Sequence, residues 1–451
     1  MKYLRLFNNH EEYLEYIASE EFVVPSVQAC KSEQEAHFND TNPEPGPTET
    51  RVVCRFNISN TETETKICSD TSVITKIEID DVELETLQTG HTFSTKGMHT
   101  VKYTPKTASK LKDNFFSNCT SIKKAFIPYT ITSIQPSLFR NCTSLENVTF
   151  YGNITSLGNS CFSGCTSLQK IDIPNTVTSI GVSAFSYCYS ISSITIPDSV
   201  TTIGQQAFLY CSGATSINIG SGITSIATET FRNCKSVTSI TVPDSVTAIS
   251  NLAFYGCSNL VSIKLSDNLT SIGNNCFINC TSLRSLEIPS GVTEVSSGCC
   301  SGCTSLSYVK LNVGLKTIKQ EAFTLCSSLT TIELPAGLEI LERHCLTSCG
   351  ALEEIIVPDS VTEIGYGAWS HDKSLTALTI GSGITTIGAN TLYDATSLTS
   401  FTIKAITPPT TVSDFLTMSV VNTIYVPSES VEAYKTSWSN YASMIQAIPT
   451  T

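Results

Sequence analysis

The sequence predicts a repeat solenoid with short parallel strands, preceded by a small all-β domain and an acidic N-terminal segment of mixed α and β structure. Three observations predict this fold class: cysteine recurs every 23 residues, each unit carries one apolar pattern, and more than half of the net charge precedes the repeats. The 451 residues include 27 Lys and Arg, 40 Asp and Glu and 19 Cys, for a net charge of −13. Because the chain is acidic and has no Lys/Arg cluster, we expect no nucleic-acid partner.

Cysteine marks the length of the repeat. Eleven cysteines follow one another at intervals of 23 residues without an insertion: Cys119, Cys142, Cys165, Cys188, Cys211, Cys234, Cys257, Cys280, Cys303, Cys326 and Cys349. The same phase continues through Asp372, Ala395 and Met418, so 13 steps of 23 between residues 119 and 418 define 14 registered units. We therefore assign residues 106–427 to the solenoid.

Each unit approximates the pattern F-x-x-C-x-x-L-x-x-I-x-I-P-x-x-V-T-x-I-G, as from Phe162 to Gly181. The I-x-I alternation predicts a brief strand, which a proline such as Pro174 ends. One coil buries about six apolar side chains worth roughly 1.5 to 3 kcal/mol each, against about 1.5 kcal/mol of ordering cost for every residue. A single coil is therefore not expected to fold, and stacked coils should pair their strands in parallel.

A stack of coils exposes its apolar core at both ends, so each end needs a capping segment. At the C-terminal end the pattern becomes helical, with Val431, Tyr434 and Trp438 on one face. We predict that residues 428–451 contain a capping helix.

The first 50 residues are strongly acidic. They hold 3 Lys and Arg against 10 Asp and Glu, a net charge of −7, which leaves −6 for the other 401 residues. We predict that residues 1–39 form an acidic docking segment, with a short helix after Asn9 and a hairpin between Val23 and Phe38. Residues 40–50 contain three prolines and no large apolar residue, which predicts a linker.

Residues 51–105 show the alternation of half-buried strands. It is clearest in Val73–Asp80, where apolar and charged side chains face opposite ways. Further candidate strands are Val52–Ile58, His91–Ser94 and Met98–Thr104. These segments predict a small β-sandwich-like domain.

Two kinds of apolar segment are missing from the sequence. Met1 to Asn9 has no apolar run of signal-peptide length, so we expect no export signal. No stretch of about 18 apolar residues occurs, so we expect no membrane insertion.

The repeat resembles the BspA-like class of leucine-rich repeat proteins, whose 23-residue unit has the F-x-x-C-x-x-L-x-x-I-x-I-P pattern. The match covers roughly Phe116 to Pro427. Ile424 to Ile448 is similar to the closing segment of such proteins in gut bacteria and their phages, and Leu6 to Phe38 is similar to openings from the same sources. The resemblance implies a leucine-rich repeat fold and a surface-exposed adhesion or recognition role, and it supplies no catalytic residues.

The cysteines invite a disulfide or metal interpretation. Eleven occupy one repeat position, and Cys161, Cys276, Cys299 and Cys345 lie four residues before it, where other units have alanine. We therefore predict buried free thiols that act as small apolar side chains, with no zinc site and no cofactor. Cys54 and Cys68 are the pair to test as a disulfide.

Acidic residues on successive strands could instead suggest a glycosidase. Seven residues after each cysteine, four coils carry Lys264, Glu287, Lys310 and Glu333. The two glutamates would lie about 9.6 Å apart, two strand spacings, at the upper end for an inverting pair. Lys310 lies between them, however, and alternating signs are what cross-strand charge pairing produces. We assign no catalytic residue, and Ser370, His371 and Asp372 are adjacent in sequence, which is not the geometry of a triad.

The exposed strand positions are the expected binding face. Candidate binding residues there are Phe126, Lys264, Glu287, Tyr308, Lys310, Glu333 and Tyr425. We predict a non-enzymatic adhesion or host-recognition protein, with a phage virion-associated component favoured over a bacterial cell-surface adhesin and over a structural spacer or decoration protein of a virion. The expected partners are a host cell-surface protein or glycan for the solenoid and a virion or assembly partner for residues 1–39. The expected location is the virion or an extracellular surface.

Overall fold

The computed structural model describes residues 44–107 and 109–449. The chain divides into two compact units, Met1–Pro45 and Gly46–Thr451, and the second unit is the one described below. The helix and hairpin predicted within residues 1–39 lie outside the described residues.

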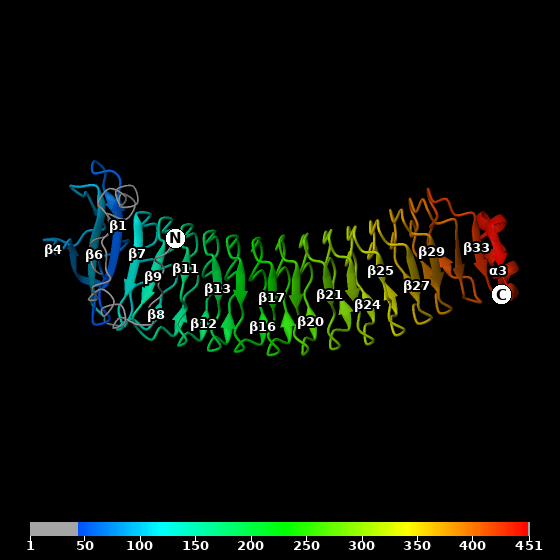
Figure 1. Cartoon of the computed structure of the whole chain (residues 1–451), viewed down its shortest axis with the longest axis horizontal. Coiled ribbons are helices and arrows are strands. Elements are labelled where there is room, and N and C mark those ends of the chain that lie inside the picture. The colour runs from blue at the N-terminus through cyan, green and yellow to red at the C-terminus, as the bar shows by residue number, and fades with distance from the viewer. Residues whose placement is uncertain (1–43, 108, 450–451) are drawn as a thin grey trace, which may run out of the picture. The chain divides into compact units, whose positions relative to one another are not determined.

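The second unit is a solenoid whose coils, except the last, each contribute two short strands, with β1 near one end and α3 at the other (Figure 1). The first strands of the coils are β7 (Ile122–Ile127), β9 (Asn147–Phe150), β11 (Lys170–Ile171), β13 (Ser193–Thr195), β15 (Ser216–Asn218), β17 (Ser239–Thr241), β19 (Ser262–Lys264), β21 (Ser285–Glu287), β23 (Tyr308–Lys310), β25 (Thr331–Ile332), β27 (Glu354–Val357), β29 (Ala377–Ile380), β31 (Ser400–Ile403) and β33 (Thr423–Val426). The second strands are β8 (Ser133–Ile134), β10 (Ser156–Leu157), β12 (Ser179–Ile180), β14 (Thr202–Ile203), β16 (Ser225–Ile226), β18 (Ala248–Ile249), β20 (Ser271–Ile272), β22 (Glu294–Val295), β24 (Thr317–Ile318), β26 (Ile340–Leu341), β28 (Glu363–Ile364), β30 (Thr386–Ile387) and β32 (Thr410–Thr411).

The strands pair in parallel at the predicted offset. Ile194 of β13 lies opposite Ile217 of β15, 23 residues later. The last step of the second ladder is longer by one residue, because Thr386 lies opposite Thr410. The prediction of a parallel-strand repeat solenoid is confirmed.

The core consists of ladders of identical side chains. Eight phenylalanines from Phe116 to Phe277 stack from coil to coil with ring centroids 5.0 to 5.7 Å apart. The ladder cysteines are fully buried, and their thiols donate to carbonyl oxygens of the preceding coil, as Cys165 Sγ does to Phe139 O at 3.1 Å. Cysteine therefore fills a small apolar space and also satisfies a buried acceptor.

Glycine ends the second strand of several coils because the backbones approach closely there. A Cβ atom on Gly204 would lie 2.4 Å from the backbone nitrogen of Val182 in the preceding coil. The backbones of neighbouring coils are therefore too close at this point for a side chain on residue 204.

The N-terminal strands of the unit extend the sheet of the first coils. They are β1 (Val52–Ile58), β2 (Thr65–Lys66), β3 (Ile74–Ile79), β4 (Val82–Glu83), β5 (Gly90–His91) and β6 (Gly97–Pro105). One seven-stranded sheet runs in the order β11-β9-β7-β1-β6-β3-β4, and β1 pairs with β7 in antiparallel fashion. The residues predicted to form a sandwich-like domain thus include the strand that covers the first coil.

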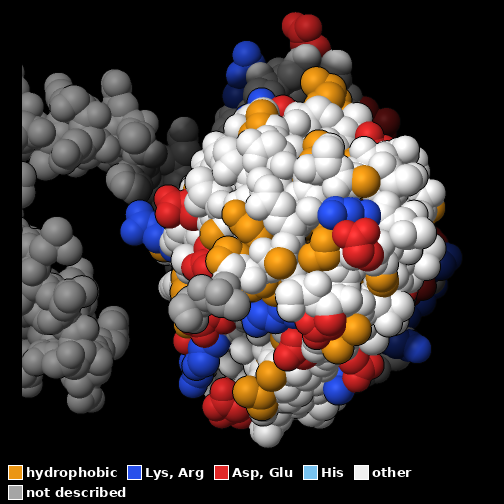
Figure 2. Space-filling view, turned by 90° about the vertical axis from the view of Figure 1, so that its right-hand side faces the viewer, with side chains coloured by type: hydrophobic (Ala, Val, Ile, Leu, Met, Phe, Trp, Pro, Cys, Tyr) orange, Lys and Arg blue, Asp and Glu red, His pale blue; other side chains and the backbone are white. Residues whose placement is uncertain are grey.

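The C-terminal cover consists of α3 (Val431–Ser437), flanked by the 3-10 turns η1 (Ser428–Ser430) and η2 (Ser439–Met444), and of β34 (Ile445–Ala447), which pairs in parallel with β33. Tyr434 and Trp438 are buried, and they donate hydrogen bonds to Ala405 O at 2.9 Å and Pro409 O at 3.0 Å. The face at this end carries small separate groups of charged and apolar side chains on a mostly uncharged polar surface (Figure 2).

Candidate binding face

The strand face is the row of outward side chains on the first strands of the coils. On β21 the exposed Ser285 and Glu287 flank Leu286, which points into the core. This alternation follows from the period of two along a strand, so every coil adds a pair of outward positions. The face is most highly charged from β19 to the end of β25.

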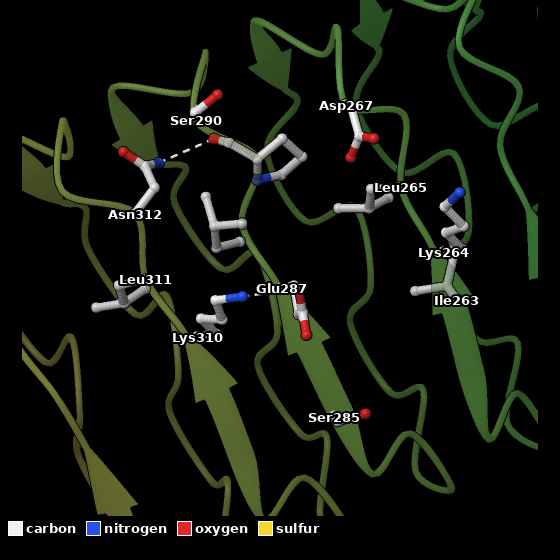
Figure 3. Close-up of a pocket in the computed structure, with 12 residues that line it drawn as sticks. Ile263, Lys264, Leu265, Asp267, Ser285, Glu287, Ser290, Lys310, Leu311 and Asn312 are labelled. Atoms are coloured by element: carbon white, nitrogen blue, oxygen red, sulfur yellow. Dashed lines mark hydrogen bonds and ion pairs between the residues drawn. The ribbon is translucent and has the colours of Figure 1, made fainter.

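A hollow of about 540 Å³ lies on this part of the strand face (Figure 3). Lys264, Glu287 and Lys310, three of the predicted binding residues, line it, and the nearly buried Leu265 and Ile288 form apolar parts of its wall. The turn beside it is fixed by Asn312, whose Nδ2 donates to the carbonyl oxygens of the two preceding-coil residues Pro289 (2.9 Å) and Val292 (2.8 Å). The hollow is open to solvent and combines charged side chains with apolar contacts. Its volume lies within the range of small-ligand sites.

Charges alternate along the hollow. Glu287 lies opposite Lys310 in the ladder, and Lys310 Nζ is 3.3 Å from Glu287 Oε2. The two side chains are 70% and 60% exposed, so the ion pair contributes at most about 1 kcal/mol to folding. Within residues 44–107 and 109–449, Lys264 makes no ion pair. The charges are therefore available to a partner.

The remaining predicted residues occupy different surroundings. Tyr308 begins β23, on the same face as Lys310, and its side chain is 49% exposed. Glu333 is exposed directly after β25, and in the described part of the chain it has no ion-pair partner. Tyr425 is half-buried on β33, where it lies opposite Thr402 and Gln446, far along the ladder from the hollow.

The prediction that Phe126 is exposed is wrong. Its side chain is only 2% exposed. Phe126 lies opposite Val53 of β1, which adds to the sheet beside β7, and the Arg55 guanidinium and the Tyr151 ring lie 5.4 and 6.5 Å from its ring centroid. Phe126 is therefore buried where the N-terminal strand β1 covers the first coil.

The side chains of three adjacent residues, Ser370, His371 and Asp372, make separate contacts. Ser370 Oγ donates to Gly367 O at 3.1 Å, and His371 Nδ1 lies 3.1 Å from Asp394 Oδ2 in the next coil. Asp372 is buried at the cysteine position of its coil. The described residues also contain no group of three or more His, Cys, Asp or Glu able to hold a metal ion.

Asp372 has an unusual environment for a carboxylate. Its Oδ1 accepts the backbone N–H of Cys349 at 2.7 Å, and its Oδ2 has no hydrogen-bond partner among the residues that the structure describes. Burial raises the pKa of the Asp372 carboxyl well above the usual 3.8, and the Cys349 N–H opposes this shift.

The 18 cysteines in the described part of the chain are free and buried, including Cys54 and Cys68. Burial raises the pKa of Cys188 and Cys257 to about 12 and that of Cys68 to about 11. Such thiols carry almost no reactive thiolate at neutral pH.

Three surface aromatic residues, two exposed and one half-buried, were missed by the sequence reasoning. Tyr187, Tyr189 and Tyr210 lie on the turns between the second strand of one coil and the first strand of the next. The Tyr187 and Tyr210 rings stack with centroids 5.3 Å apart, and Tyr189 lies 6.2 Å from Tyr187. Tyrosine directly before two consecutive ladder cysteines was the signal that could have revealed them.

The family model of the BspA type leucine-rich repeat region matches residues 89–215, 203–326 and 294–416, with six copies. Together these matches extend from residue 89 to residue 416, most of the chain. The chain belongs to the BspA type leucine-rich repeat family. The resemblance inferred from the 23-residue pattern is thereby confirmed.

Solved structures to which the chain is similar include three bacterial proteins. A leucine-rich repeat protein from Bacteroides ovatus has a TM-score of 0.60 at 22% identity, covering 84% of this chain and 100% of that one. A leucine-rich cell surface protein from Faecalibacterium prausnitzii has a TM-score of 0.42 at 23% identity, covering 77% and 84%. The pneumococcal vaccine antigen PcpA has a TM-score of 0.47 at 20% identity, covering 76% and 85%. A comparison with curated proteins gives no match.

BspA type leucine-rich repeat proteins are typically non-enzymatic binding proteins of the cell surface or extracellular space. Membership suggests protein–protein interaction or adhesion for this chain. Among the residues that the structure describes, no helix has the length and apolar character needed to cross a membrane.

Proposed function

We propose that this BspA type protein is a non-enzymatic adhesion or host-recognition protein that binds a surface protein through its strand face. The observation that carries the proposal is the exposed ladder of Lys264, Glu287, Lys310 and Glu333 on four successive coils. Tyr308 stands beside it, and tyrosine is enriched among residues that dominate binding energy. Several other coils place small uncharged side chains such as Ser193 on this face, whereas the β11 coil carries the Lys170–Asp172 ion pair there.

The physical properties of the ladder favour binding over folding as its role. Charges on successive strands are about 4.8 Å apart, so a partner segment lying along the face would meet alternating signs. Such a pattern sets the register of a partner and steers its approach, because electrostatic complementarity acts mainly on specificity and on-rate. The coil backbone beneath is held by the ladder hydrogen bonds, so little conformational entropy is lost on binding.

The setting of the protein is part of the same proposal. The family favours a cell surface or the extracellular space. A virion-associated location is the setting favoured by sequence, and in either setting we propose that residues 1–39 dock the chain to its assembly. Deleting residues 1–39 should then leave binding to target cells intact and abolish co-purification with the assembly, whether envelope or virion.

The experiment that tests adhesion is a titration of fluorescently labelled full-length chain on intact candidate host cells, before and after surface proteolysis. Saturable binding that proteolysis removes and added salt weakens is the expected result. Failure to bind at any salt concentration would contradict adhesion and leave a structural spacer as the role of the solenoid. Binding that survives proteolysis would contradict a protein partner.

A further inference from the structure

Tyr187, Tyr189 and Tyr210, the tyrosine turn cluster, lie on a part of the surface separate from the strand face. Tyr187 and Tyr189 precede β13, and Tyr210 precedes β15. The side chains of Tyr187 and Tyr189 are 41% and 44% exposed. The Tyr187 and Tyr210 rings are inclined by only 14° with centroids 5.3 Å apart. The cluster is thus a solvent-facing aromatic platform.

The backbone position of Tyr187 and Tyr210 is costly for a bulky side chain. Both residues have positive φ, +62° and +59°, in the left-handed region. The equivalent residue, directly before the ladder cysteine, is elsewhere Asn118, Asn141, Gly164, Asn233, Gly256, Asn279, Gly302, Leu325 and Ser348, mostly types that tolerate this conformation. Because Tyr187 is exposed and Tyr210 is only half-buried, core packing does not repay the strain. Strained, exposed aromatic residues of this kind are candidates for function.

The coil before Tyr187 leaves space beside its ring. Gly164 occupies the equivalent position there, with φ of +76° and no side chain. The outer face of Tyr187 therefore lacks the ring that Tyr210 supplies on the other face. This space beside the Tyr187 ring, the slot, is bounded on its other side by Asn141. A Cβ atom on Gly164 would lie 2.4 Å from Asn141 Oδ1. Asn141 Nδ2 donates to Asn118 Oδ1 at 3.0 Å, which fixes the amide with Oδ1 toward the slot.

Apart from Arg140, which directly precedes Asn141, the groups around the slot are polar and uncharged. Ser163 Oγ and Ser186 Oγ lie 2.8 Å apart on the same two coils. Arg232, in the coil beyond Tyr210, is engaged by Glu229 at 2.8 Å and lies over the Tyr255 ring at 4.7 Å. The slot itself offers an aromatic face, an amide oxygen and hydroxyls, and the exposed Arg140 adds one cation at its far end.

We propose that the tyrosine turn cluster binds a neutral glycan, with one pyranose ring seated on the outer face of Tyr187. The face of an aromatic ring is electron-rich and attracts C–H groups, and a pyranose presents several C–H groups on one side. Asn141 Oδ1 would accept a sugar hydroxyl at the rim of the slot. A protein partner is disfavoured because three rings form a narrow platform, far smaller than the roughly 800 Å² per partner of a stable protein interface.

Glycan binding at this cluster goes beyond the protein adhesion proposed for the strand face. The test is a titration of full-length chain with neutral glucose-, galactose- and N-acetylglucosamine-based oligosaccharides, followed by saturation-transfer NMR and calorimetry. We expect at least one of these probes to bind the wild-type chain. Tyr187→Asn and Gly164→Asn should each weaken binding about tenfold or more, the first by removing the ring and the second by filling the slot.

Tyr187→Asn introduces the residue that other coils use at this position and should fold at least as well as the wild type. Gly164→Asn also introduces that residue, and its Cβ atom requires the Asn141 side chain to turn aside. Tyr187→Phe keeps the ring and should retain most of the affinity, and Lys310→Glu on the strand face should leave glycan binding unchanged. No binding of any oligosaccharide, or unchanged binding by Tyr187→Asn, would overturn the proposal. Tyr187-dependent binding of a protein in place of glycans would also overturn it. Cell adhesion by the Tyr187→Asn variant is measured in parallel. Intact adhesion together with absent glycan binding by the wild-type chain overturns the glycan proposal alone and leaves the strand-face proposal standing.

Discussion

Lys310 Nζ and Glu287 Oε2 lie 3.3 Å apart across neighbouring coils, and both side chains are mostly exposed. The pair joins β21 and β23 at the edge of the hollow on the strand face (Figure 3). Its position explains why charges alternate along this part of the ladder, since like charges directly opposite would repel.

The ion pair should matter little for folding. Glu287→Lys would place like charges on Lys264, residue 287 and Lys310, and should lower the free energy of unfolding by no more than about 1 kcal/mol, because the sites are exposed. The exchanged variant Glu287→Lys/Lys310→Glu should recover little of the loss, because residue 287 then faces Lys264 and residue 310 then faces Glu333. Urea midpoints of the two variants provide the measurement, and a loss several times larger would show that the pair is structurally required.

Asp372 should destabilise the solenoid more as the pH rises. Burial raises its folded-state pKa above the usual 3.8, so the unfolded chain releases the proton first and stability falls between that value and the folded-state pKa. Asp372→Cys restores the ladder residue and lets the Cys349 N–H bond within its own turn, as the Cys326 N–H does to Phe323 O at 3.2 Å.

We expect Asp372→Cys to raise the free energy of unfolding by about 1 to 3 kcal/mol near neutral pH, with a smaller gain near pH 4. Urea denaturation of variant and wild type across this pH range measures the difference. Glu354→Ala serves as control, because the Glu354 side chain is exposed on β27. A gain for Asp372→Cys that is constant with pH would contradict a buried carboxyl whose pKa is raised.

The thiols should be inert in the folded protein. The cysteines at the described positions are buried, and burial raises their pKa where a shift is resolved, as for Cys142 at about 12. Iodoacetamide at about pH 8 should leave these positions unmodified in the native protein and modify them all in denaturant. Peptide mass spectrometry identifies which cysteines carry the modification. Native labelling of several ladder cysteines, or a Cys54–Cys68 disulfide in the unreduced protein, would contradict the structure.

The C-terminal cover should be essential for the last coils. Trp438 is buried, and its ring centroid lies 5.2 Å from that of Phe415. Trp438→Ala should cost about 3 to 5 kcal/mol. Hydrogen exchange should then accelerate first in β31 and β33, because stability is local along a solenoid. Ser437→Ala, at an exposed neighbouring position, is the control. Uniform acceleration throughout the solenoid would contradict a cap that acts on the adjacent coils.

Much of the fold follows from the 23-residue phase. The position of Cys165 in the repeat predicted its burial, and the alternation around Ile171 and Ile173 predicted which side chains face inward. The same phase placed Lys310 between Glu287 and Glu333 on one ladder. These inferences succeed because each coil repeats the geometry of its neighbour, so a local pattern determines contacts between coils.

Contacts without a repeat could not be predicted in this way. Phe126 has the phase of an exposed residue, but β1, about 70 residues earlier in the chain, pairs beside it and covers it. Tyr187 stacks on Tyr210 because of a left-handed backbone in the turn, which periodicity alone does not reveal. The acidic docking segment predicted at residues 1–39 stays a prediction.

The most direct test of the adhesion proposal is a comparison of two charge-altered proteins in one cell-binding titration. The first carries Lys264→Glu, Tyr308→Ala and Lys310→Glu on the strand face. The matched control carries Lys235→Glu and Lys316→Glu, which make the same change in net charge at exposed positions outside the strand face. We predict that the first protein loses about tenfold or more in affinity while the control binds like the wild type. Equal binding by all three proteins would contradict the assignment of the strand face as the adhesion surface.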